Sequence, residues 1–365
     1  MEPRPDDRKI RSLHGLRAVM AWWVVAGHLA QAFGWKLPLV DTPSLAVDVF
    51  ILLSGFVIAM LVERKAETYA AYILRRAFRL FPLYLPLLLI SAALLPVQLA
   101  VWESLPPTPG SIDRIVIAQA ALAHLPFHLG IHAALLQGVV PTRYAEDVAV
   151  SIMAQAWSVS LEWQFYLIAP FLIAALYRQA WVQALAMVVA LQLAAIFFPG
   201  AFLGVQILLF VAGIATRMAM QPKLRRQALV IAALCGAVTV GRDGVMQLVP
   251  LGIWGAVIAS SLAPQGSVAQ GAARLLGTRA AYQMGEISYA IYLLHFIVFF
   301  VSAYACIRFG LDGAARAAVI SGATIGFTYL GALACHTLIE RPGIQLGARL
   351  ARNLGGPALA IPPSR

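Results

Sequence analysis

The sequence predicts an all-α integral membrane protein, a polytopic helical bundle of about ten transmembrane helices. Of its 365 residues, 61% are hydrophobic and only 12% are charged, whereas a soluble domain carries about a quarter charged residues. The mean hydropathy is +0.80. One soluble core cannot enclose this much apolar surface, and the lipid bilayer is the solvent that suits it.

Ten apolar runs are each long enough to cross a bilayer. They cover residues 16–34, 43–62, 80–99, 160–177, 181–198, 202–219, 226–241, 245–263, 285–306 and 314–338. Pro126 and several histidines interrupt a further stretch at 111–138. That stretch could be an eleventh span, an interfacial helix or a re-entrant segment.

The distribution of positive charge decides among these topologies. If 111–138 does not cross and the N-terminus is cytoplasmic, the inner segments carry 20 of the 27 Lys and Arg residues and the outer segments carry 6, with Arg17 inside the first helix. Cytoplasmic loops are rich in Lys and Arg. We therefore expect ten spans with both termini cytoplasmic, a membrane domain over residues 1–345 and a short cytoplasmic tail over residues 346–365. The net charge of +11 has the same origin and predicts no nucleic-acid partner.

The first helix carries two ionisable residues, Arg17 and His28, eleven positions apart. They share one face to within about 20° and are separated by about 16.5 Å along the axis. Arg17 then lies near the cytoplasmic end and His28 in the outer half of the membrane. An ionisable side chain at that depth marks a functional site by default. The alternative is a histidine that only hydrogen-bonds a neighbouring helix, and we favour function.

Asp48 lies at a similar predicted depth in the second helix, about six residues from its outer end. Short connections favour neighbouring helices, so Asp48 and His28 could meet. A carboxylate beside an imidazole fixes its tautomer and stabilises its protonated form. The alternative, that Asp48 bonds a backbone group near the interface, is equally well supported.

A basic cluster, Arg75, Arg76 and Arg79, precedes the third predicted span. Arg75 and Arg79 share a helix face, and guanidinium groups bind phosphate in a forked geometry. Taken alone, the cluster is an ordinary positive-inside feature. Its position at the same end as Arg17 favours anion binding.

Two further segments combine polar and aromatic residues in apolar surroundings. Trp157 to Tyr166 opens the fourth span at the outer side and contains Glu162. Glu162 is either a first-turn acid favoured by the helix dipole or a carboxylate near His28 on the acceptor side. Ser288 to His295 places a second histidine near mid-membrane, where it either lines the same cavity or forms a structural bond.

His124, His128 and His132 recur every four residues, which is a spacing that could suit zinc. Pro126 breaks the helix that would align them, and no carboxylate or Cys completes a ligand set. The sequence also has no phosphate-binding Gly loop, nucleophile elbow or dinucleotide motif. We predict no metal and no tightly bound cofactor.

Several segments in a fixed order give the chain a resemblance to the acyltransferase 3 family, the membrane O-acyltransferases that modify bacterial surface sugars. They are Leu13-His-Gly-Leu-Arg17 with His28, Val47-Asp-Val-Phe-Ile-Leu-Leu-Ser54-Gly-Phe, Arg75-Arg-Ala-Phe-Arg79-Leu-Phe-Pro82, Trp157-Ser-Val-Ser-Leu-Glu162 and Ile287-Ser-Tyr-Ala-Ile-Tyr-Leu-Leu-His295. His14 departs from the pattern, because many members carry Asp before Gly-Leu-Arg. The extracytoplasmic esterase-like domain of some members is absent.

The resemblance implies an O-acyltransferase of the bacterial inner membrane that uses cytoplasmic acyl-CoA, with acetyl as the default acyl group, as its co-substrate. The acceptor is then a hydroxyl on the outer side, typically of a carbohydrate. The first-helix Arg and His are expected to be essential. On this interpretation His28 is the general base, since an imidazole titrates near neutral pH, and Asp48 or Glu162 orients it.

The same interpretation assigns the remaining candidates. The donor's phosphates are held by Arg17, Arg75, Arg76 and Arg79, and the expected cavity lining is Ser54, Trp157, Tyr166, Ser288 and His295. A transporter or flippase, with these charges lining a path, is the main alternative. No inverted halves are visible, which argues against it. A catalytically inactive scaffold is a third interpretation, and intact Arg17 and His28 argue against that one.

Overall fold

The computed structural model describes residues 5–65, 67–105, 109–145, 147–262, 271 and 275–355. Within these ranges the chain is helical throughout, with short connections and no strand, so the all-α prediction is confirmed. The helices are α1 (Pro5–Phe33), α2 (Ser44–Arg64), α3 (Tyr69–Ala93), α4 (Leu95–Ser104), α5 (Pro109–Ala123), α6 (Leu125–Ala133), α7 (Trp157–Tyr177), α8 (Trp181–Ala194), α9 (Leu203–Met218), α10 (Arg225–Asp243), α11 (Leu248–Leu262), α13 (Arg279–Glu286), α14 (Ser288–Arg308), α15 (Gly313–Cys335) and α16 (Arg341–Ala351).

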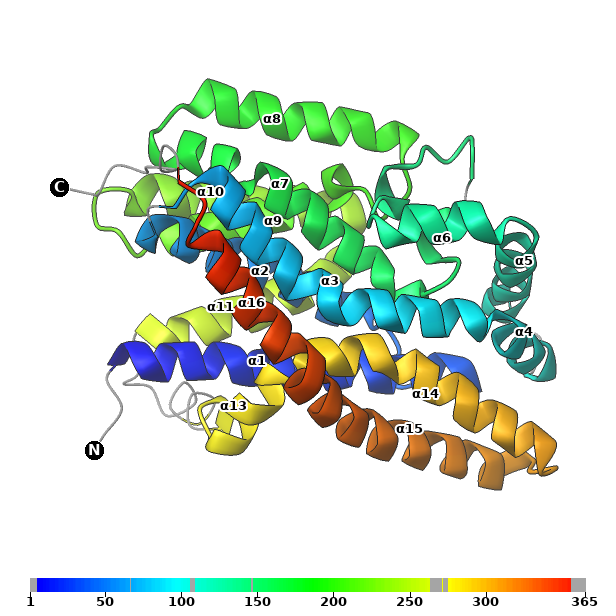
Figure 1. Ribbon diagram of the computed structural model, residues 1–365. Coiled ribbons are helices and arrows are strands. Elements are labelled where there is room, and N and C mark those ends of the chain that lie inside the picture. Colours follow the sequence, from blue (N-terminus) through cyan, green and yellow to red (C-terminus); the bar gives the residue numbers. More distant parts are fainter. Residues whose placement is uncertain are drawn as a thin grey trace.

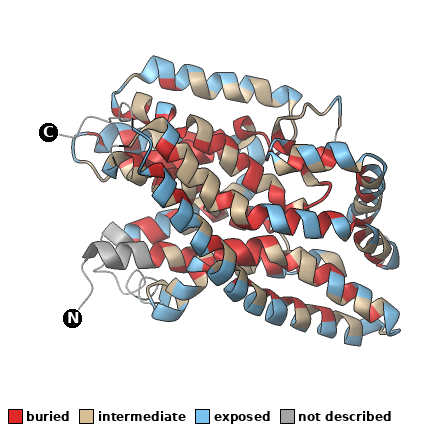
Figure 2. Cartoon of the chain, viewed as in Figure 1, coloured by how far each residue is buried: buried red, intermediate tan, exposed pale blue. Residues whose placement is uncertain are grey.

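The helices form one bundle in which α1, α8 and α14 run in roughly the same direction, whereas α5 stands across them (Figure 1). α4 and α5 lie at one end, and the start of α1 and the end of α16 lie towards the other (Figure 1). Buried residues concentrate on the inner helices, whereas the outward faces of α8 and α15 are exposed (Figure 2). The first and last described helices therefore have these ends on the same side of the bundle (Figure 1).

The outer surface of the bundle is apolar. Val182 on α8 is 80% exposed, Leu234 on α10 is 60% exposed and Phe327 on α15 is 63% exposed. Polar side chains such as Ser160 and His295 are buried inside instead. Exposed apolar surface on this scale needs an apolar surrounding, so the chain is an integral membrane protein.

Close backbone contact holds α2 against α9 at the centre of the bundle. A side chain at Gly213 would collide with the backbone carbonyl of Leu52, and one at Gly55 would collide with that of Phe210. Small residues let membrane helices approach closely enough for van der Waals packing to hold them together. α2 is thereby fixed where several site residues depend on it.

Four helical segments in the described chain are long and apolar enough to span a membrane: Ser44–Arg64, Ala154–Tyr177, Ser288–Arg308 and Gly313–Ala351. Two bent pairs raise this number to six, and Trp181–Phe197, Leu203–Met218 and Val245–Ser260 are shorter apolar helices. Each of the ten predicted runs overlaps a helix, but the count of ten spans stays a prediction.

The third run differs from its predicted range of 80–99. α3 begins at Tyr69 and ends at Ala93, and α4 leaves it at an angle of 60°. Pro96 lies in the first turn of α4, where its missing N–H is tolerated. The helix therefore starts earlier than its apolar stretch, so the basic cluster lies within α3.

The ambiguous stretch 111–138 is not one straight helix. α5 and α6 meet at His124 with a bend of 97°, and Pro126 occupies the first turn of α6, as expected where proline restarts a helix. Nδ1 of His128 lies 2.8 Å from Oγ of Ser151, and Nε2 of His132 lies 2.8 Å from the carbonyl oxygen of Val148. These histidines hold the connection that leads to α7.

The chain from α15 to α16 is continuous through a π-helical turn, His336–Glu340. α16 packs along α3, since Gly343 and Gly347 lie against Pro82 and Phe78. Residues 346–351, which the sequence analysis placed in the tail, are therefore helical and packed on the bundle. The part of that tail after residue 355 lies outside the described residues.

Candidate active site

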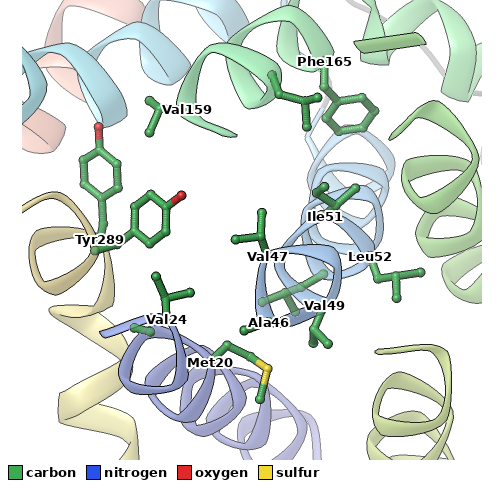
Figure 3. Close-up of a cluster of buried hydrophobic side chains, with 14 of the residues drawn as sticks. Met20, Val24, Ala46, Val47, Val49, Ile51, Leu52, Val159, Phe165 and Tyr289 are labelled. Atoms are coloured by element: carbon green, nitrogen blue, oxygen red, sulfur yellow. The ribbon is translucent and has the colours of Figure 1, made fainter. Parts of the chain in front are cut away.

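A cavity of about 110 Å³ opens between α1, α2, α3, α7 and α14. Val47, Val159 and Tyr289 face this central space from α2, α7 and α14 (Figure 3). The full lining is Arg17, Val47, Phe50, Ile51, Leu53, Ser54, Val57, Ile58, Arg76, Arg79, Ser158, Val159, Leu161, Glu162, Tyr166, Phe210, Ser288, Tyr289 and Tyr292. Apolar walls thus surround a small set of charged and hydroxyl groups, as in typical ligand sites.

Two arginines of this cavity, Arg17 and Arg76, have no anionic partner among the described residues. Within the described part of the chain, neither Arg17 nor Arg76 forms a salt bridge, and the Nε atom of each is buried without a hydrogen bond. The guanidinium of Arg76 lies 5.8 Å from the ring centre of Tyr166. Unpaired buried donors are costly, so the cavity is prepared for an anionic or strongly polarised ligand.

The third arginine of the cavity, Arg79, is already paired. Its guanidinium donates to the buried carboxylate of Glu340, and Nδ1 of His336 lies 3.1 Å from the same carboxylate. Arg79 also lies over the ring of Tyr289, 5.0 Å from its centre. Its charge is therefore largely compensated from the C-terminal helices.

Arg75 does not line the cavity. Its Nε lies 2.8 Å from Oε2 of Glu67, two residues before α3 begins. Arg75 and Arg79 were predicted to share the functional helix face, but the pair that lines the cavity is Arg76 and Arg79, at i, i+3 spacing. A helix turns by about 100° per residue, so adjacent arginines cannot both point the same way.

Glu162 lies among the arginines of the cavity. Its carboxylate accepts a hydrogen bond from Tyr166 and one of 3.3 Å from Ser54. One of the two interpretations from the sequence was a carboxylate on the acceptor side near His28. The structure gathers Glu162 with Arg17, Arg76 and Arg79 around one space. One carboxylate and two unpaired arginines leave this cavity net positive.

His28 lies outside this cavity and contacts a second histidine. Its Nδ1 is 3.0 Å from Nε2 of His295, and Nδ1 of His295 is 2.7 Å from the carbonyl oxygen of Tyr292. The hydroxyl of Tyr292 is 2.7 Å from Oγ of Ser158, a cavity residue. Tyr292 therefore joins the cavity to the histidine pair.

Asp48 is not the partner of His28. Its Oδ2 accepts a 3.0 Å hydrogen bond from Nε2 of Gln247, next to α11. Asp48 is buried, so this bond satisfies a carboxylate that would otherwise be stranded. The pairing of His28 with Asp48 that the sequence suggested is absent from the described residues, and His295 takes that place.

The cavity, its arginines and the pair of histidines all lie within a part of the chain that matches a known protein family. Residues 10–334 of the 365 match acyltransferase 3, described as an acyltransferase domain. The chain belongs to the acyltransferase 3 family. Comparisons with curated proteins and with solved structures give no match. The suspected resemblance is thereby confirmed, and the protein is a membrane acyltransferase.

The acyltransferase cavity contains seven of the twelve residues singled out from the sequence. Ser54, Tyr166 and Ser288 line it with Arg17, Arg76, Arg79 and Glu162. Trp157 packs against the core but is not part of the lining. The remaining four, His28, Asp48, Arg75 and His295, have the partners described above. Their roles in this acyltransferase stay predictions.

Sequence reasoning missed four residues of the acyltransferase site: Ser158, Tyr289, Tyr292 and Glu340. Tyr289 and Tyr292 follow Ser288 in a segment already singled out. Tyr292 and His295 are spaced i, i+3, so the sequence could have predicted that they share a helix face. Glu340 lies beyond the last predicted span. Its contact with Arg79 depends on the continuation of α15 into α16, which no apolar pattern marks.

Proposed function

We propose that this acyltransferase moves an acyl group from cytoplasmic acyl-CoA to a hydroxyl of an extracytoplasmic acceptor, most naturally a carbohydrate. The observation that carries the proposal is the pair of arginines, Arg17 and Arg76, that line a largely apolar cavity and form no salt bridge with a described residue. Guanidinium groups bind phosphate oxygens in a forked geometry. Acyl-CoA carries phosphates at one end and, at the other, an acyl group that can lie against apolar side chains.

The size of the cavity supports a short acyl group. Its volume of about 110 Å³ is well below the 300–1,000 Å³ of sites that enclose a whole drug-sized ligand. Only the thioester end of the donor fits inside such a space, and acetyl is the acyl group that needs least of it. The nucleotide end of the donor then stays towards the arginines.

The sidedness of the donor follows from charge. Arg64, Lys65 and Arg178 mark the helix ends that are rich in basic residues. Such basic ends are typical of the cytoplasmic side of a membrane protein. Arg17 and the α3 arginines lie towards that side, and a charged CoA thioester cannot diffuse across the bilayer core. In this scheme the protein spans a bacterial inner membrane, and both of its termini are cytoplasmic.

His28 is the general base of the proposed reaction. It removes the proton of the acceptor hydroxyl as that oxygen attacks the acyl carbon, and the thiol of CoA leaves. Nothing in this direct transfer calls for a metal or a tightly bound cofactor. The contact of His28 with His295, which is joined to the cavity through Tyr292, supports a base close to the donor's acyl end.

The test uses the purified full-length protein in lipid nanodiscs with radiolabelled acetyl-CoA and an acceptor oligosaccharide. Acceptor-dependent release of free CoA, with the label recovered on the sugar, supports the proposal. Arg17→Ala should abolish this release at low donor concentration, while Arg75→Ala serves as the matched control because Arg75 pairs with Glu67. Uptake of substrate into vesicles without CoA release would support a transporter instead.

A further inference from the structure

His28 in α1 and His295 in α14 form a stacked pair of imidazoles. Nδ1 of His28 lies 3.0 Å from Nε2 of His295, and the ring planes differ by 7° with centres 5.2 Å apart. Nδ1 of His295 lies 2.7 Å from the carbonyl oxygen of Tyr292, one turn earlier in α14. These three groups form a hydrogen-bonded chain that ends on His28.

The carbonyl oxygen of Tyr292 sets the direction of this chain, because a carbonyl can only accept. Nδ1 of His295 must therefore carry a hydrogen and donate it. In a neutral imidazole the other ring nitrogen, Nε2, is then an acceptor. His28 consequently carries its hydrogen on Nδ1, donates it to His295, and keeps a free lone pair on its own Nε2.

A charged His295 would reverse this assignment, but its surroundings disfavour the charge. His295 is 1% exposed, and its ring neighbours are His28, Tyr292 and Phe296. Across the described ranges, no carboxylate forms a hydrogen bond or salt bridge with it. A buried charge without a partner is strongly disfavoured, so His295 is neutral.

The lone pair on Nε2 of His28 is available to a ligand. His28 is only half-buried, and its recorded hydrogen bond uses Nδ1 alone. Nε2 has no hydrogen-bond partner among the described residues. The free nitrogen of the pair is therefore the one left for a ligand.

We infer that His295 is the positioning residue of His28: it holds His28 as the Nδ1–H tautomer, so that Nε2 is the atom that takes the acceptor's proton. This inference rests on the proposed acyl transfer. The acceptor oxygen bonds the acyl carbon as its proton passes to Nε2 of His28. The carbon–sulfur bond breaks, and the CoA sulfur leaves with the electron pair and takes the proton from His28.

His295 here does the work that a carboxylate does in hydrolytic triads, where a buried acid orients the histidine and stabilises the imidazolium. While His28 is protonated, its Nδ1–H donates a charge-assisted hydrogen bond to His295, which is stronger than a neutral one. A neutral partner adds no second buried charge to the membrane interior. This explains how His28 is oriented although Asp48 bonds Gln247 instead.

The direct test is ¹⁵N NMR of the full-length protein, with histidine side chains labelled, in lipid at neutral pH. The signals of the two residues are assigned by their loss in His28→Asn and His295→Gln. We expect both histidines to be protonated on Nδ1 and unprotonated on Nε2. A wild-type His28 protonated on Nε2 would overturn the inference. Correct tautomers in a protein that transfers no acyl group would uphold the orientation of His28 by His295 and refute the proposed acyl transfer.

A pair of variants separates positioning from packing. His295→Phe keeps a ring of similar size but removes the acceptor for Nδ1–H of His28, whereas the amide oxygen of His295→Gln can replace it. We expect His295→Phe to lower kcat by at least about tenfold, and by no more than the 10²–10⁴ that a placed general base contributes, with KM for acyl-CoA unchanged. His295→Gln should recover most of kcat. Equal loss in both variants, with both folded, would mean that His295 only packs.

Discussion

Arg79 in α3 and Glu340 in the π-helical turn after α15 form a buried ion pair between residues 261 positions apart. Glu340 is 2% exposed and also bonds His336. The pair joins the basic cluster to the C-terminal helices. It leaves Arg17 and Arg76 as the cavity cations that a donor can neutralise.

Glu340→Ala should destabilise the protein because it strands the charge of Arg79. Breaking a buried ion pair by removing one partner costs about 3–5 kcal/mol, and because Arg79 is partly exposed we expect a loss at the lower end of this range. Thermal unfolding of the purified protein in detergent measures it. The double variant Arg79→Met with Glu340→Leu should recover part of the loss. An unchanged midpoint for Glu340→Ala would mean that water already solvates Arg79.

Arg17→Ala and Arg76→Ala should weaken donor binding, each by roughly 1.5–3 kcal/mol, the value of a hydrogen bond to a charged group. This corresponds to about a 10- to 150-fold rise in KM for acyl-CoA. Arg75→Ala should change KM far less, because Arg75 bonds Glu67 outside the cavity. Lys in place of Arg17 or Arg76 should restore donor binding only in part, since an ammonium group lacks the forked pair of N–H donors of a guanidinium. A larger effect at Arg75 than at Arg76 would contradict the assignment.

His28→Ala should abolish acyl transfer while the protein inserts and folds normally. A positioned general base contributes about 10²–10⁴ in rate, so residual CoA release should fall at least about 100-fold at saturating donor. Size-exclusion behaviour and thermal stability in detergent report the fold, and binding of labelled acyl-CoA should persist. Normal turnover in a folded His28→Ala variant would remove His28 as the base.

Gly213→Ala should disturb the contact between α2 and α9, because the added methyl group meets the backbone of Leu52. Overpacking of this kind costs about 1–3 kcal/mol. Gly252→Ala in α11 is the matched control, since the added carbon meets nothing within 4 Å and Ala is the better helix former. The two thermal midpoints should therefore move in opposite directions, and equal shifts would show that α9 can move away from α2.

Sidedness can be measured in oriented proteoliposomes. Transfer should require acyl-CoA on the face that exposes Arg64 and acceptor on the face that exposes Arg308, because the two faces differ in basic residues. Full activity with donor and acceptor both supplied on the Arg64 face would refute a reaction across the membrane, although His28 could still act as the base.

The periodic and compositional features were predictable from the sequence, and the partners of buried groups were not. Arg76, Glu162 and Ser54 could be singled out because polar residues in apolar runs stand out. The choice between Arg75 and Arg76 depends on the rotation of α3 about its axis, which neighbouring helices set. The partner of His28 also had to come from packing: both Asp48 and His295 suited its depth, and only the packing of α1 on α14 selects His295.

The order of synthesis gives the Arg79–Glu340 pair a further consequence. The ribosome completes α3 long before Glu340, and at about 5–20 residues per second the remaining 261 positions take about 13–50 s. Throughout that time Arg79 lacks the carboxylate of Glu340, so its guanidinium needs water or another anion in its place. Complete packing of α3 therefore requires the C-terminal helix α16. A chain truncated before Glu340 should be incompletely folded and a substrate for membrane proteases.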